Sequence, residues 1–211
     1  MSNLVITISR TYGSGGKSIG RLVAEKMGLE FYDEQLIQRA SELSGINEDY
    51  FAQADERITI RQQILRFLSP QGGYTSEPKG PESRRYTGQD NLYRIQASVI
   101  EQLGRRENCV IIGRAGFYLL RNYVNAVRVH IIAPPDECAA AVARRLSISI
   151  QRARQLVLST NKERADYHKH YTDVNWEDPN CYDLVLNTSR LSHSQCADVI
   201  CKYAAERMKN Q

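Results

Sequence analysis

Short apolar runs alternate along this chain with longer stretches in which apolar residues recur at every third or fourth position. Such short runs, rich in β-branched residues and bounded by glycine or polar residues, predict buried β-strands. The first of them, LVITI at 4–8, stops at a glycine cluster, as a strand entering a tight loop does. Strands are predicted in this way at 4–8, 29–33, 108–113, 127–133 and 181–188.

The longer stretches predict helices between the strands. From Ser18 onward the apolar residues lie at helical spacing, and Gly28 ends the pattern as a C-terminal cap does. Further helices are predicted at 34–45, 47–68, 89–104, 135–146 and 147–170, and from about residue 192. Strands that alternate with helices indicate an α/β protein. We expect an open parallel sheet of about five strands, with helices on both faces and ligands outside the carboxyl ends of the strands.

One segment fits neither pattern. Residues 69–88 hold three prolines and four glycines among twenty residues, which predicts a flexible loop rather than core. The chain as a whole suits a single domain over residues 1–211, because 42% of its residues are apolar and 25% are charged, as in ordinary globular proteins.

Charge, hydropathy and cysteines narrow the class of protein. The net charge of +4 comes from dispersed basic residues, which suits a small anionic ligand at least as well as nucleic acid, so no nucleic-acid partner is expected. No apolar run is long enough to cross a membrane and the first residues lack the pattern of a signal peptide, so a cytoplasmic location is predicted. The five cysteines include no C-x-x-C pair and are expected to be free thiols.

The segment SRTYGSGGKSIG at 9–20 is similar to a phosphate-binding loop placed between a strand and a helix. The usual motif is G-x-x-x-x-G-K-[ST]; Gly16, Lys17 and Ser18 fit its end, whereas Thr11 stands at its first glycine. In such loops backbone N–H groups and the positive helix end bind phosphates, the lysine neutralises charge on the transferring group, and the hydroxyl holds Mg²⁺. The predicted ATP-binding residues here are Gly13, Ser14, Gly15, Gly16, Lys17 and Ser18, and Ser18 is also the predicted Mg²⁺ ligand.

Five segments carry a family resemblance. VITISRTYGSGGKSIGRLVAEKMGLEFYDEQLIQRA is followed in order by LYRIQASVIEQL, NCVIIGRAG, KERADYHKHYTDVNWEDP and YDLVLNTS. In order and spacing they resemble the cytidylate kinase-like proteins, relatives of the P-loop nucleoside monophosphate kinases, over nearly the whole chain. The resemblance implies a P-loop NTPase-type three-layer fold, with an acceptor-binding section at about 30–90 and an arginine-rich mobile lid at about 147–178. It also implies ATP and Mg²⁺ as cofactors and a small nucleotide as substrate.

The resemblance further implies roles for single residues. Asp33 and Arg39 correspond to positions that meet a pyrimidine monophosphate, and Arg114 corresponds to the arginine that binds the acceptor phosphate. Arg164 corresponds to a lid arginine that closes over the transferring phosphate, and Asp166 belongs to the same K-E-R-x-D run. The predicted catalytic residues are therefore Lys17, Arg114 and Arg164, and the predicted substrate-binding residues are Asp33, Arg39, Arg114 and Asp166.

The phosphate loop departs from the family pattern in its register. In an ungapped comparison the family's lysine falls on Gly16, so Lys17 comes one residue late, and one residue on a helix is a rotation of about 100°. A gap restores the lysine but leaves Thr11 at the first glycine. Arg10, at the end of the first predicted strand, is an alternative cation for the donor phosphates, and the competing interpretation is a surface arginine paired with a carboxylate.

The metal site departs as well. Acidic residues flank the Gly-Arg pair in the family, whereas Ile112 and Ala115 are the neighbours here. Asp33 is the nearest substitute carboxylate, and an ion held by phosphates, water and Ser18 is the alternative.

These features predict an in-line transfer of the γ-phosphoryl group of ATP to a nucleoside monophosphate, above all CMP or dCMP. Lys17 or Arg10 would contact the donor phosphates, with Arg114 and Arg164 around the moving group. Two alternatives stay open: a kinase of another small metabolite, and a nucleotide-binding or regulatory protein without turnover.

Overall fold

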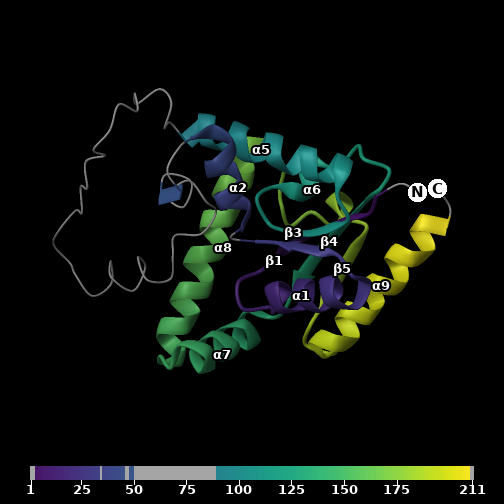
Figure 1. Cartoon of the computed structure of the whole chain (residues 1–211). Helices are drawn as coiled ribbons and strands as arrows, with labels where there is room; N and C mark the ends of the chain where they lie inside the picture. The colour runs from purple at the N-terminus through teal and green to yellow at the C-terminus, as the bar shows by residue number, and fades with distance from the viewer. Residues whose placement is uncertain (1–2, 34, 46–47, 50–88, 210–211) are drawn as a thin grey trace.

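The computed structural model describes residues 3–33, 35–45, 48–49 and 89–209. Its strands are β1 (Val5–Arg10), β2 (Glu30–Tyr32), β3 (Cys109–Ile112), β4 (Ala126–Ile132) and β5 (Leu184–Asn187). Its helices are α1 (Gly16–Met27), α2 (Gln35–Ser44), α5 (Gln89–Arg106), α6 (Gly116–Leu119), α7 (Pro135–Leu146), α8 (Ile150–Thr172) and α9 (His193–Lys209), with a 3₁₀ turn at Pro179–Cys181. The predicted class is confirmed: the five strands form one parallel sheet in the order β2-β3-β1-β4-β5 (Figure 1).

Strand β1 lies at the centre of the sheet, and all six of its residues are buried. Because side chains alternate between the two faces of a strand, the residues of β1 pack in two separate hydrophobic cores. Ile6 and Ile8 pack in the core that includes residues of α1 and α9, whereas Val5 packs with residues of α2 and α5. The sheet is therefore covered by helices on both faces, as Figure 1 shows, and the ends of its strands remain as the place for a ligand site.

Helices α7 and α8 form a pair beside the sheet, with a small core of their own that includes Cys138, Val142 and Leu156. Helix α7 begins with a proline in its first turn, and Ser149 is the N-cap of α8, where its side chain accepts a hydrogen bond from the Arg152 amide. The far end of α8 reaches α5, where the rings of Tyr93 and Tyr171 stack with centroids 4.1 Å apart. Helix α8 thus connects α7 with α5.

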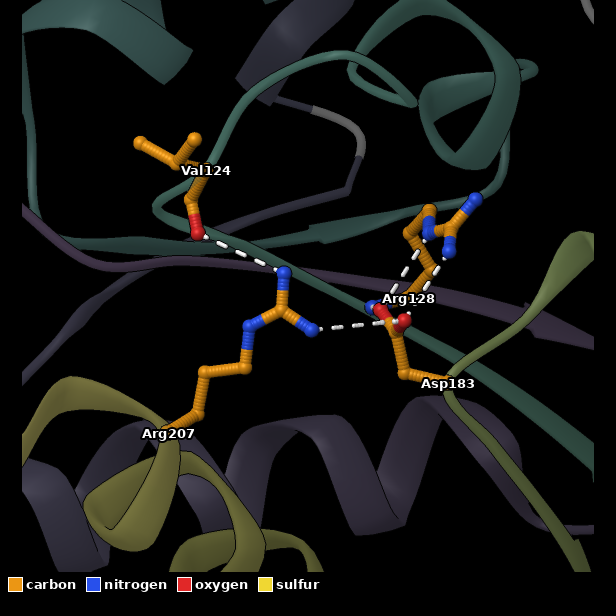
Figure 2. Close-up of polar contacts among 4 residues, drawn as sticks. All are labelled: Val124, Arg128, Asp183 and Arg207. Carbon is orange, nitrogen blue, oxygen red and sulfur yellow. Dashed lines mark hydrogen bonds and ion pairs between the residues drawn. The ribbon is translucent and has the colours of Figure 1, made fainter. Parts of the chain in front are cut away.

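At the amino-terminal end of β4, opposite to the carboxyl ends of the strands, a charged network joins β4 to β5 and α9 (Figure 2). Arg128 donates from Nε and Nη2 to the two carboxylate oxygens of Asp183, at 3.2 and 2.9 Å. The Arg128 amide also donates to Asp183 Oδ2 at 2.8 Å, and Arg207 Nη1 lies 3.5 Å from Oδ1. Asp183 has 10% of its side chain exposed, so this pair is largely removed from solvent.

Aromatic and histidine side chains fill the space between the sheet and α8. The His130 ring stacks on Tyr182 at 4.8 Å and meets the Trp176 ring edge-on at 5.2 Å. His168, from α8, stacks on Trp176 at 5.7 Å and contacts Phe117. Burial lowers the pKa of His130 to about 4, with further lowering by nearby His168 and two arginines, so His130 is neutral at physiological pH.

This low pKa predicts a loss of stability in acid. Between pH 6.5 and about 4 the unfolded chain binds a proton at His130 and the folded chain does not, so the free energy of unfolding falls by about 1.4 kcal/mol per pH unit as the pH falls. The variant His130→Phe keeps a packed ring and should remove this part of the slope in urea unfolding between pH 4.5 and 7. His170→Phe, at an exposed position of α8, is the control for the substitution of a histidine by phenylalanine. Equal slopes for wild type and His130→Phe would contradict the prediction.

The structure refines several predicted boundaries. Helix α1 begins at Gly16, two residues before the predicted Ser18, and α6 at Gly116–Leu119 was not predicted at all. The predicted helix 47–68 lies almost entirely outside the described residues, and the flexible loop 69–88 does so completely. Most of the predicted lid is the continuous helix α8, and its closing motion stays a prediction. No helix in the described ranges is long and apolar enough to cross a membrane.

Candidate functional site

The predicted site residues converge at the carboxyl ends of three neighbouring strands. Arg10 is the last residue of β1, Asp33 directly follows β2, and Arg114 lies two residues after β3. All three are buried, with exposed fractions of 5%, 4% and 2%. Buried charged residues at the ligand-binding edge of a parallel sheet indicate a functional site rather than a packing detail.

The glycine loop between β1 and α1 adopts a conformation that requires glycine. Gly13 and Gly15 have φ angles of 94° and 85°, in the left-handed region that other residues rarely enter. Gly15 is the N-cap of α1 and provides no side-chain hydrogen bond to the first turn. The positive end of α1 therefore points out of the loop without a side-chain cap, as a phosphate-binding helix end does.

Contacts from distant parts of the chain hold the loop in place. The Ser14 hydroxyl donates to the carbonyls of Thr11 and Ile131, at 2.8 and 3.1 Å, and the Thr188 hydroxyl donates to the Ser14 carbonyl at 3.1 Å. On the other side, the Tyr12 amide donates to Asn161 Oδ1 of α8 at 2.8 Å. Ser14, predicted to bind ATP, thus uses its hydroxyl to shape the loop.

Three of the loop glycines also lie too close to other atoms to carry a side chain. A Cβ at Gly13 would lie 2.7 Å from the backbone carbonyl oxygen of Cys138, and one at Gly15 would lie 2.2 Å from Nε2 of His193. A Cβ at Gly16 would lie 2.6 Å from Cβ of Arg10. These close approaches favour glycine at all three positions.

Lys17 points toward the end of β2. Its Nζ lies 2.7 Å from Oδ2 of Asp33; 42% of the Lys17 side chain is exposed, against 5% for Asp33. Both residues also line a cavity of about 480 Å³ between α1 and β2. The late lysine is thus directed to the β2 side of the loop, and its role in binding phosphate stays a prediction.

Arg114 approaches the same aspartate from β3. Its Nη1 donates a hydrogen bond to the backbone carbonyl of Asp33. Arg114 has a φ of 52° and follows Gly113 at 70°, so the chain turns sharply after β3 and sends this side chain across to β2. Lys17, Asp33 and Arg114 therefore form one cluster, in which Lys17 pairs with the carboxylate of Asp33 and Arg114 bonds its backbone carbonyl.

Arg164 and Arg10 form a second group, beside the first. Arg164 is 2% exposed and donates from Nη1 to the Arg10 carbonyl at 2.8 Å, with its guanidinium 5.7 Å from the centre of the Tyr12 ring. Asp166, in contrast, lies on the exposed side of α8 and pairs with Lys162 at 2.9 Å. Two neighbours in one sequence motif are thus separated by the helix, one built into the site and one facing solvent.

The pattern that defines the Cytidylate kinase-like family matches residues 5–190 of this chain. The chain belongs to this family. Among curated relatives, the cytidylate kinase of Ignicoccus hospitalis is 24% identical over 197 residues, which cover 93% of this chain and 96% of that protein. Membership of the cytidylate kinase-like family supports a kinase role, which transfers a phosphoryl group and uses a nucleotide.

Solved structures agree with the fold of this cytidylate kinase-like protein. A protein from Eubacterium ventriosum described as uncharacterized superposes with a TM-score of 0.70 at 19% identity, covering 96% of this chain and 99% of that one. The shikimate kinase of Bacteroides thetaiotaomicron superposes with a TM-score of 0.53 at 12% identity, covering 98% of both chains. At these identities the likeness concerns the fold, which is that of P-loop kinases.

Other predicted site residues fall at different places. Ser18 is exposed in the first turn of α1. Arg39 lies in α2, and its side chain is outside the part that the structure describes. Among the described residues, no three histidine, cysteine, aspartate or glutamate side chains are grouped to hold a metal ion. A metal in this kinase-like site would therefore rely on oxygens of the nucleotide and water in addition to Ser18 or Asp33.

Two residues that contact the loop were not predicted from the sequence. His193 opens α9, and its imidazole lies against Gly15, although 178 positions separate them. Asn161, in α8, accepts the hydrogen bond from the Tyr12 amide described above. No local pattern marks either residue, because each reaches the loop only through the packing of its helix.

Proposed function

We propose that the protein transfers the γ-phosphoryl group of ATP to a nucleoside monophosphate, with CMP or dCMP as the acceptor. The observation that carries the proposal is the convergence of the glycine loop, the uncapped start of α1 and the cluster of Lys17, Asp33 and Arg114 at one end of the sheet. Phosphoryl transfer needs positioning and charge stabilisation more than covalent chemistry, and these groups provide both.

The donor side is formed by the loop. The backbone of Gly13, Gly15 and Gly16 borders the triphosphate, because these glycines put no side chain between the loop N–H groups and the phosphates. Arg164 stands beside the loop at the end of β1 and stabilises negative charge on the transferring group. Its buried position fixes it there at little further cost in entropy when the nucleotide binds.

The acceptor side is formed at the ends of β2 and β3. Arg114 binds the acceptor phosphate, since its guanidinium can form paired hydrogen bonds with phosphate oxygens. Asp33, Arg39 and Asp166 are the remaining substrate-binding residues proposed from the family resemblance. For Asp166, which faces solvent, this requires that the α8 region closes over the bound nucleotides.

Mg²⁺ is the proposed metal. When bound, it would neutralise charge that develops on the transferring phosphates. The Ser18 hydroxyl and the Asp33 carboxylate are the oxygen groups of this chain proposed to hold it, in keeping with the preference of Mg²⁺ for oxygen ligands and retained water.

The test is an acceptor screen with the purified full chain, ATP and Mg²⁺, following ADP release and the phosphorylated product. CMP, dCMP, UMP, AMP and GMP are compared with non-nucleotide acceptors such as shikimate and gluconate. We expect turnover with CMP or dCMP at roughly 1–100 per second. Product formed only from a non-nucleotide acceptor would indicate a metabolite kinase, and ATP binding without ADP release for any acceptor would indicate a regulatory protein; either result refutes the proposal.

A further inference from the structure

Relative to the usual motif, a basic residue and a glycine have exchanged positions in the phosphate loop of this protein. In the motif G-x-x-x-x-G-K-[ST], the first glycine and the lysine are six positions apart. If Gly15, the N-cap of α1, is the second glycine of the motif, the first glycine falls on Arg10 and the lysine falls on Gly16. The chain therefore has a basic residue where the motif has glycine, and glycine where the motif has a basic residue.

The structure brings these two positions into direct contact. A Cβ built on Gly16 would lie 2.6 Å from Cβ and 3.0 Å from Cγ of Arg10, both closer than a real side chain tolerates. The stem of Arg10 thus fills the space in which a lysine at position 16 would begin. A side chain at position 10 therefore requires glycine at position 16, and a side chain at position 16 requires glycine at position 10. The usual motif has glycine at the first position and lysine at the second, whereas this chain has arginine at the first and glycine at the second.

The stem of Arg10 lies on the donor side of the loop. Along β1, Ile6 and Ile8 face the core that α1 covers, and Arg10 continues this alternation at the end of the strand. Its Cβ and Cγ lie against the first residue of α1, so its side chain starts from the end of the helix that binds phosphate. The Arg10 backbone is fixed from the other side by Arg164 Nη1 at 2.8 Å.

Lys17 is directed elsewhere. Its ammonium pairs with Asp33 at 2.7 Å, and Asp33 also accepts the hydrogen bond from Arg114. This places Lys17 among the groups at the ends of β2 and β3, on the side proposed for the acceptor.

We propose that Arg10 replaces the loop lysine on the donor phosphates, and that Lys17 acts with Arg114 on the acceptor phosphate. The inference rests on the proposed function, and it assigns each of its cations to one substrate. Arginine suits the donor role because its guanidinium keeps its charge when buried and can bind two phosphate oxygens at once. Asp33 holds Lys17 in position until an acceptor phosphate competes for its ammonium.

The test measures ATP binding by calorimetry with Mg²⁺ and no acceptor, so it does not depend on which acceptor is used. Arg10→Gly should weaken ATP binding about tenfold or more, as expected for the loss of a charged hydrogen bond. Lys17→Met should leave the ATP dissociation constant within about twofold of wild type and raise the KM of the acceptor about tenfold. Lys26→Met is the matched control, because Lys26 lies on the same helix and pairs with exposed Asp198.

A reciprocal exchange gives an independent result. Gly16→Lys alone should fail to bind ATP normally because its Cβ collides with Arg10, whereas the double variant Arg10→Gly/Gly16→Lys should recover ATP affinity to within about fivefold of wild type. The variant Arg10→Gly/Gly16→Met fills the same space without a charge and should bind ATP as weakly as Arg10→Gly; equal recovery by lysine and methionine at position 16 would show a structural role of Arg10 and overturn the inference.

Three outcomes decide between the inference and the proposed function. If wild type binds ATP and transfers phosphate, but Lys17→Met weakens ATP binding tenfold, the inference is wrong and the proposed function stands. If Arg10→Gly folds and binds ATP like wild type, the inference is likewise wrong. If wild type neither binds ATP nor transfers phosphate, the proposed function fails and the inference fails with it.

Discussion

Replacing Arg114 by alanine is expected to lower kcat/KM for the acceptor nucleotide by at least about a hundredfold, the usual effect of removing a positioned charge-stabilising group. Arg114 is 2% exposed and has a φ of 52° in the turn after β3. Its guanidinium donates a hydrogen bond to the backbone carbonyl of Asp33. Its loss removes the cation proposed for the acceptor phosphate and a restraint on the end of β2. Steady-state kinetics with saturating ATP and varied acceptor would measure the effect.

Two further variants separate catalysis from folding. Arg114→Lys keeps the charge but loses the paired hydrogen bonds, so we expect an intermediate kcat/KM. Arg121→Ala removes an arginine whose guanidinium lies 3.8 Å from the centre of the Tyr118 ring, outside the proposed site, and should leave kcat/KM near wild type. Urea unfolding gives the fraction of Arg114→Ala that is folded at the assay temperature. If the loss of folded protein accounts for the whole loss of activity, the role of Arg114 is structural and the prediction is wrong.

Replacing Asp183 by alanine is expected to lower the free energy of unfolding by about 3 kcal/mol, because it leaves Arg128 largely buried without its carboxylate. For a chain of this size the change corresponds to a fall in Tm of about 10 °C. The network in Figure 2 joins the start of β4 to β5 and α9, at the end of the sheet opposite the proposed site. Thermal and urea unfolding would measure the loss.

The control is the exposed pair of Lys26 and Asp198, which has a similar short distance of 2.7 Å. Asp198→Ala should cost no more than about 1 kcal/mol, since solvent screens exposed pairs. Equal losses for Asp183→Ala and Asp198→Ala would contradict the prediction.

The same network predicts a pH dependence. Burial raises the pKa of Asp183, but the hydrogen bonds and charge of Arg128 lower it more, so the net pKa lies below its ordinary value. A carboxyl with a lowered pKa stabilises the fold above its unfolded pKa of about 3.9 and loses this contribution as the pH falls through the lower, folded value. Acid should therefore destabilise wild type more than Asp183→Ala below about pH 4.

The proposed division of cations also explains why the loop appears irregular in sequence. A glycine at position 16 looks like a lost lysine when the motif is compared residue by residue. In the folded chain Arg10 occupies the adjoining space, so the loop still has a basic residue at the donor side. In the proposed arrangement the donor cation therefore comes from the opposite end of the same loop.

Much of the fold follows from local patterns. The β-branched runs, the helical spacing after the loop and the proline-started helix at Pro135–Leu146 are all set by residues within one element. Within the described ranges the predicted elements appear within a few residues of their places, whereas the predicted helix 47–68 stays a prediction. Short α6 escaped prediction because four residues cannot display a helical period, and its start depends on two left-handed residues, Arg114 and Ala115.

The candidate site divides along the same line. The sequence by itself determined that a strand, a glycine loop and a helix follow in order, with basic residues near them, because strand period and glycine conformation are local properties. Only the tertiary structure decided that Lys17 meets Asp33, that Arg10 fills the space beside Gly16, and that Arg164 is buried while Asp166 is exposed. These directions depend on contacts between segments up to 154 positions apart, as between Arg10 and Arg164, and such contacts exist only after the helices have packed on the sheet.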